Sequence, residues 1–198
     1  MRALFLILLL TIPSFSQTLS EMFQEKVKTF ESTPGQKVTY DKFHDVTLIS
    51  ADSQKLKANG PYRALFDAHF SLWSYLWGKE PIVNANTFSL YFYSDSSTWL
   101  FMKHHGLILL VDGQKGDFGE GSWDGNVGMH GVSETIKFHL TRSDILAISK
   151  AQNVEFQLGG FEGEFSDADR QLFKNVIEMA TIWPDKPKRP APRKRKRA

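Results

Sequence analysis

Short segments in which apolar and polar residues alternate follow one another through most of this 198-residue chain. Successive side chains of a β-strand point to opposite faces, so this alternation is typical of strands that bury one face. The segments span residues 37–50, 64–72, 87–94, 134–140 and 153–160. Turn residues separate the neighbouring segments in the first half of the chain, and no crossover long enough for a helix intervenes. This spacing favours antiparallel pairing.

Two longer segments have the spacing of amphipathic helices. Residues 18–30 begin with Thr18 and Glu21 at the spacing of a capping box, and Ser166 and Asp169 repeat that spacing near the end of the chain. Each segment then carries one apolar stripe. The stripes consist of Leu19, Met22, Phe23, Val27 and Phe30 in the first helix and of Leu172, Phe173, Val176, Ile177 and Ala180 in the last.

A shorter helix is expected at residues 143–152, with Ser143 as its N-cap. It lies before residues 153–160, which we predict to be the last strand. This order of elements predicts an α+β fold. We expect an antiparallel sheet or sandwich with the N-terminal and C-terminal helices packed on it and one short helix before the last strand.

The first residues match the pattern of a secretory signal peptide. Arg2 precedes an apolar run at residues 3–12, and Ser14-Phe15-Ser16 supplies small residues for cleavage after Ser16. The chain has no cysteine and no Asn-x-Ser/Thr acceptor, which favours a bacterial exported protein held by packing alone. Since no later apolar run reaches about 20 residues, we expect no transmembrane segment after signal removal. The predicted location is the periplasm or the medium.

Charge divides the remaining chain into two parts. Residues 185–198 carry eight of the 24 basic residues and one of the 22 acidic residues, a formal charge of +7. Residues 17–184 carry 15 basic and 21 acidic residues, a formal charge of −6. We therefore predict a signal peptide at 1–16, one globular domain at 17–184 and a disordered, Pro-rich basic tail at 185–198. The predicted anion-binding residues are Lys186, Lys188, Arg189, Arg193, Lys194, Arg195, Lys196 and Arg197.

The glycine-rich residues 112–126 carry acidic side chains, but their spacing differs from that of a calcium-binding EF-hand loop. We therefore expect a long hairpin loop there. Zinc binding by His104, His105 and His130 conflicts with the alternation of side chains along a strand. Ser122 lacks the flanking glycines of a nucleophile elbow. The sequence thus predicts no catalytic residue, no metal site and no cofactor, although a metal-dependent enzyme using residues 104–130 stays an alternative.

Trp73, Tyr75 and Trp77 alternate with other residues in a predicted strand. They are candidates for an aromatic platform that binds a sugar or a peptide, or for a strand edge buried under a helix. We expect a small, non-enzymatic, exported binding or envelope-associated protein. Its tail would attach to anionic lipid, polysaccharide or another polyanion. An accessory subunit docking on an acidic protein partner is a further alternative, and the oligomeric state is left open.

Overall fold

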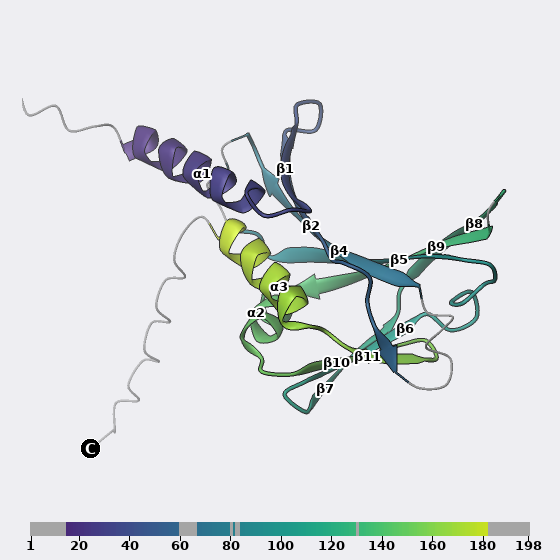
Figure 1. The fold of residues 1–198 in the computed structure, drawn as a ribbon. Helices are drawn as coiled ribbons and strands as arrows, with labels where there is room; N and C mark the ends of the chain where they lie inside the picture. Colours follow the sequence, from purple (N-terminus) through teal and green to yellow (C-terminus); the bar gives the residue numbers. More distant parts are fainter. Residues whose placement is uncertain (1–14, 60–66, 80, 82–83, 130, 182–198) are drawn as a thin grey trace, which may run out of the picture.

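A computed structural model describes residues 15–59, 67–79, 81, 84–129 and 131–181, and for residues 15–19 it describes the backbone alone. These residues form two antiparallel sheets and three helices (Figure 1). The α+β class predicted from the sequence is confirmed. No helix in the described part of the chain is long and apolar enough to cross a membrane.

The larger sheet has six strands in the order β1-β2-β4-β5-β9-β8. Every neighbouring pair in this sheet is antiparallel. Since β2 and β5 flank β4 on its two sides, β4 is an interior strand. The strands are β1 (Gln36–Asp41), β2 (Val46–Asp52), β4 (Ala68–Trp77), β5 (Thr87–Ser96), β8 (Ser122–Gly128) and β9 (Gly131–Thr141).

The smaller sheet has five strands in the order β3-β11-β10-β6-β7, and they are also antiparallel. The strands are β3 (Ala58–Asn59), β6 (Gly106–Val111), β7 (Gln114–Glu120), β10 (Val154–Leu158) and β11 (Phe161–Glu164). Two strands, β10 and β11, follow the short helix, whereas the sequence indicated one. The extra strand is only four residues long, too short for a period of two to stand out.

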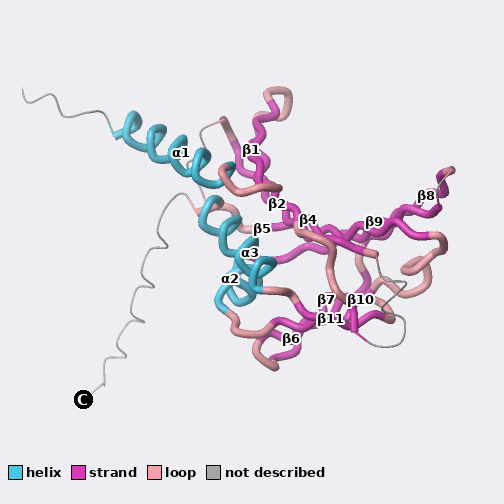
Figure 2. Tube along the Cα trace, viewed as in Figure 1, coloured by secondary structure: helices cyan, strands magenta, loops and turns pink. Residues whose placement is uncertain are grey.

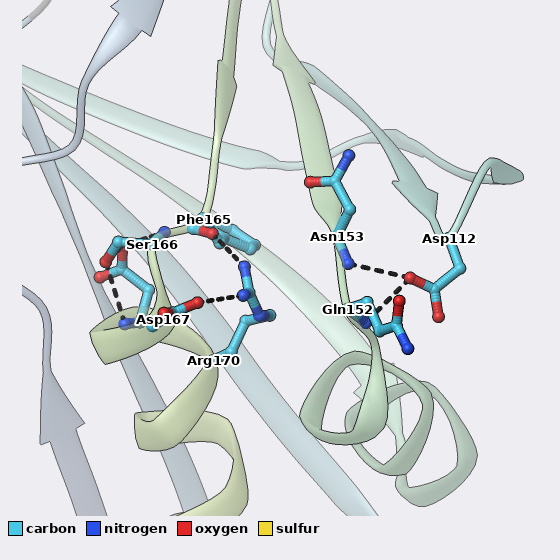
Figure 3. Close-up of polar contacts among 8 residues, drawn as sticks. Asp112, Gln152, Asn153, Phe165, Ser166, Asp167 and Arg170 are labelled. Atoms are coloured by element: carbon cyan, nitrogen blue, oxygen red, sulfur yellow. Dashed lines mark hydrogen bonds and ion pairs between the residues drawn. The ribbon is translucent and has the colours of Figure 1, made fainter.

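The three helices are α1 (Phe15–Glu31), α2 (Arg142–Lys150) and α3 (Asp167–Met179), and they lie together on one side of the molecule (Figure 2). Ser166 caps α3 in a capping box with Asp169, as predicted. Arg170 donates a hydrogen bond to the Phe165 carbonyl at 2.7 Å and pairs with Asp167, which also secures the start of α3 (Figure 3).

The predicted starts of the other two helices are wrong. The N-cap of α2 is Thr141, not Ser143, because the Thr141 hydroxyl accepts the Asp144 amide while the Asp144 carboxylate accepts the Thr141 amide. Helix α1 already includes Phe15, so Thr18 lies inside it and is not its cap. A capping-box spacing marks a helix start only where the preceding residues leave the helical conformation.

Phenylalanine rings join the two sheets and α3 into one core. The ring of Phe70 on β4 lies 5.3 Å from that of Phe173 on α3 and 5.2 Å from that of Phe165. The ring of Phe92 on β5 lies 6.5 Å from that of Phe156 on β10. The smaller sheet and α3 therefore pack on the same face of the larger sheet, which we call its inner face.

The glycine-rich residues 112–126 are mostly strand, so the prediction of a long hairpin loop is wrong. Strands β7 and β8 occupy most of this stretch and pair with β6 and β9. Glycine there allows close contact with aromatic rings, because a Cβ atom on Gly125 would lie 2.5 Å from the Trp99 ring and 2.6 Å from the Trp123 ring. Pairing with long neighbouring strands outweighs the low strand propensity of glycine and aspartate.

Residues 97–105 form a loop between β5 and β6. The buried carboxylate of Glu134 on β9 fixes this loop. It accepts the Leu100 amide at 2.7 Å, the Phe101 amide at 3.0 Å and the Trp123 indole N–H at 3.1 Å. These bonds hold Phe101 in the core, where it is almost fully buried. Glu134 lies on the same inward face of β9 as Ile136, Phe138 and Leu140. Because it is charged, nothing in the sequence indicated that it would be buried there.

Candidate binding surface

The outer face of the larger sheet carries a cluster of five aromatic side chains, which we call the aromatic face. They are Trp73, Tyr75 and Trp77 on β4 and Tyr91 and Tyr93 on β5. Trp77 is 73% exposed and Tyr75 is 47% exposed. Large exposed aromatic side chains on the middle of a sheet are typical of binding surfaces, because soluble proteins seldom leave such apolar area in water.

The inner part of the aromatic face is well packed. The ring centroids of Trp73 and Tyr91 lie 4.6 Å apart, and those of Tyr91 and Tyr93 lie 6.0 Å apart. The Trp73 indole N–H donates to the hydroxyl of buried Ser71 at 2.5 Å. These contacts hold the rings in place before any ligand arrives, so little side-chain entropy is lost when one binds.

Two phenols of the aromatic face, those of Tyr75 and Tyr93, have raised pKa values. Burial, together with the neighbouring Tyr91, raises the pKa of Tyr93 to about 12. Burial also raises the pKa of Tyr75, and Tyr91 adds to this effect. The Lys137 ammonium lies over the Tyr91 ring, 5.4 Å from its centroid, as a cation–π contact. Lys137 therefore places a positive charge over Tyr91, while the Asp52 carboxylate places a negative charge near Tyr93.

A groove of about 460 Å³ borders the exposed end of the aromatic face. Tyr75 and Trp77 provide its apolar wall. Its polar lining includes Asn84, Asn86, Lys137 and His139. Register explains this grouping, because Lys137 of β9 pairs with Tyr91 of β5 and His139 pairs with Ser89. Ring faces, amides, an imidazole and the Lys137 ammonium within one groove suit a ligand that is apolar on one side and anionic on another.

The two hypotheses for Trp73, Tyr75 and Trp77 can now be separated. The strand that carries them is interior, and its exposed Trp77 is not buried under a helix, so the buried-edge hypothesis is wrong. Sequence reasoning missed Tyr91, Tyr93, Lys137 and His139 as parts of the same surface. Tyr91 and Tyr93 alternate in the same way as Trp73 and Tyr75, but nothing in the sequence states that β5 lies beside β4.

Two acidic side chains of residues 112–126 accept hydrogen bonds that hold the fold together. The Asp112 carboxylate accepts the backbone amides of Gln152 and Asn153, each at 2.9 Å, and so ties the β6–β7 turn to the start of β10 (Figure 3). The Glu120 carboxylate accepts the His105 amide at 3.1 Å. Within the described ranges, no three metal-binding side chains come together. His130 lies outside these ranges, and Ser122 is an exposed strand residue.

The eight basic tail residues and residues 1–14 of the predicted signal peptide lie outside the described residues. The chain matches no known family model, no curated protein and no solved structure. The chemistry of the described surface is therefore the basis for a functional proposal.

Proposed function

We propose that this is an exported, non-enzymatic binding protein whose aromatic face and groove bind an acidic polysaccharide, with the basic tail adding attachment to the same polymer. One observation carries the proposal: the exposed indole of Trp77 shares a groove with the side chains of Lys137 and His139. Export rests on the signal-peptide pattern at residues 1–16.

Each part of the groove suits one part of a charged sugar. The C–H face of a pyranose ring is apolar and packs on an indole or phenol ring, while its hydroxyls hydrogen-bond to amides such as that of Asn86. The Lys137 ammonium attracts a uronate or sulfate group, and the ring of His139 can donate a hydrogen bond to it. A neutral sugar would leave the charge of Lys137 unused, so the groove favours an acidic polymer.

The end of α3, which precedes the tail in the sequence, lies close to this groove. Ala85, which lines the groove, donates its amide to the Ala180 carbonyl at the end of α3 at 3.1 Å. The basic residues start six positions after Ala180, and an extended chain covers at most about 3.3–3.6 Å per residue. Lys186, the first of these cations, is thus tethered within about 20 Å of Ala180, and Arg197, the last, within about 60 Å. Two linked contacts to one polymer raise the apparent affinity through a high effective concentration.

Binding to immobilised heparin, with neutral dextran as a comparison polymer, tests the proposal. We expect Trp77→Ala to weaken heparin binding by about tenfold, since an aromatic contact contributes about 0.5–1.5 kcal/mol beyond its buried area. Met129→Ala is a control, because Met129 is also a large, mostly exposed apolar side chain (97% against 73% for Trp77) but lies at the opposite end of β9 from His139. Deleting residues 185–198 should also weaken binding and reduce its salt dependence.

The proposed sugar-binding surface is refuted if Trp77→Ala binds heparin with wild-type affinity and the tail deletion abolishes heparin binding. The tail alone would then be the contact. Anionic phosphatidylglycerol vesicles form a second arm. Binding to vesicles that depends on Trp77, without binding to heparin, would replace the polysaccharide by a lipid surface. Binding to an acidic protein that persists above about 0.5 M salt would favour the accessory-subunit alternative, because packed interfaces resist screening.

A further inference from the structure

A second and larger cleft lies between the helices, far along the sheet from the β8–β9 hairpin. It has a volume of about 950 Å³, within the range of about 300–1,000 Å³ typical of small-molecule sites. Helices α1, α2 and α3 all contribute to its walls, and Gln36 of β1 completes them. Its apolar lining includes Phe30, Leu146, Ile177 and Met179, which together provide room for an alkyl chain.

Gln36 has an unusual environment in this cleft. The residue is only 6% exposed, and both polar atoms of its carboxamide, Oε1 and Nε2, are buried without a hydrogen-bond partner among the described residues. Buried polar groups in folded proteins are nearly always paired, because an unpaired one loses its bonds to water without replacement. This amide needs a donor and an acceptor at the same time. A hydroxyl supplies both, whereas a carboxylate can only accept.

The cations of the cleft are engaged in holding α3. The Lys26 ammonium donates to the carbonyls of Glu178 at 3.2 Å and Thr181 at 2.6 Å, and Arg142 donates to the Thr181 hydroxyl at 2.8 Å. Cations stabilise the C-terminal end of a helix in this way. The lining also contains Glu25, so two basic and two acidic side chains leave no net charge. Burial lowers the pKa of Lys26, which is a further sign that this region disfavours charge.

We propose that the cleft binds a single-chain amphiphile with an uncharged, hydroxyl-bearing headgroup, whose hydroxyl pairs with the Gln36 carboxamide while its alkyl chain lies on the apolar walls. The headgroup follows from the donor-and-acceptor requirement of Gln36 together with the balanced charge. The chain follows from the apolar residues of three helices. This site is independent of the aromatic face, because no residue lines both the cleft and the groove.

Isothermal titration calorimetry with monodecanoylglycerol and decanoate, below their aggregation concentrations, tests the proposal on the full chain. The two probes carry chains of the same length and differ in the headgroup. We expect monodecanoylglycerol to bind at least about tenfold more tightly, which corresponds to one hydrogen-bonded polar contact. Gln36→Leu should clearly reduce that preference, because leucine keeps the bulk of the side chain and removes both polar atoms, and the preference that remains reports the charge balance of the cleft. Gln24→Leu, at an exposed position of α1 outside the cleft, is the matched control.

A second variant keeps the proposal testable if Gln36→Leu fails to fold. Met22 lies at the exposed rim of the cleft, so Met22→Trp should narrow the cleft and weaken both probes without disturbing the core. The proposal is overturned if neither probe binds, if decanoate binds as tightly as monodecanoylglycerol, or if Gln36→Leu keeps the full preference. Trp77→Ala should leave monodecanoylglycerol binding unchanged, which separates this site from the polysaccharide surface.

Discussion

Replacing Glu134 by glutamine should destabilise the fold although the two side chains have nearly the same shape. Glu134 is 2% exposed and accepts three N–H groups, two from the loop at residues 97–105 and one from the Trp123 indole. A glutamine has a single acceptor oxygen, so its NH₂ group would face at least one of these N–H donors. The variant therefore loses at least one hydrogen bond to a charged acceptor and leaves a buried donor unpaired.

The loss can be given a size. A hydrogen bond to a charged group contributes about 1.5–3 kcal/mol, and an unpaired buried donor adds about 1–3 kcal/mol. Removing the buried charge recovers part of this, because a carboxylate is costly to desolvate. We expect Glu134→Gln to lower the free energy of unfolding by about 2–4 kcal/mol, and the melting temperature by roughly 5–12 °C for a chain of this length.

Urea unfolding followed by circular dichroism measures this change, with near-ultraviolet signals reporting on the neighbouring Trp99 and Trp123 rings, 5.6 Å apart. Glu164→Gln, at an exposed position of β11, is the matched control and should change stability by less than about 0.5 kcal/mol. If Glu134→Gln were as stable as the control, the carboxylate would not be what holds the loop, and this reasoning would be refuted.

Gly163→Ala should destabilise by about 1–3 kcal/mol in urea unfolding, because its Cβ would lie 2.4 Å from the Phe156 ring, while Gly160→Ala meets no neighbour within 4 Å and should be tolerated. The raised pKa of Tyr93, about 12, means that the folded state favours the neutral phenol, so its contribution is full below pH 10 and is lost as pH rises through 12. The urea midpoint should therefore decrease less between pH 9 and pH 11 for Tyr93→Phe than for the wild type. An equal decrease in the two proteins would contradict the raised pKa. Deleting 185–198 should leave the melting temperature nearly unchanged, and a clear drop would mean that the tail packs on the fold. N-terminal sequencing of exported protein should begin at Gln17, and a start at Met1 would contradict a signal peptide.

The period of the apolar residues was enough to predict β4, β5, β9 and β10 and the stretch that forms β1 and β2. In β10 the side chains of Val154, Phe156 and Leu158 are all buried, as their alternation indicated. The start of α3 was also predictable, because a capping box with Ser166 and Asp169 is local chemistry within four residues. These features depend on neighbouring positions in the chain, so they can be recognised without knowing the rest of the fold.

The sequence by itself determined which face of β4, β5, β9 and β10 is apolar, and it showed that Trp73, Tyr75 and Trp77 lie on one face of their strand. Only the tertiary structure decided that β4 lies between β2 and β5, which joins Trp77 to Lys137 and His139 in one groove. Only the tertiary structure also paired Glu134 with a loop more than 30 residues away. An alternating pattern specifies the side of a strand that is buried, but the partner that covers it is chosen by packing between segments distant in the chain.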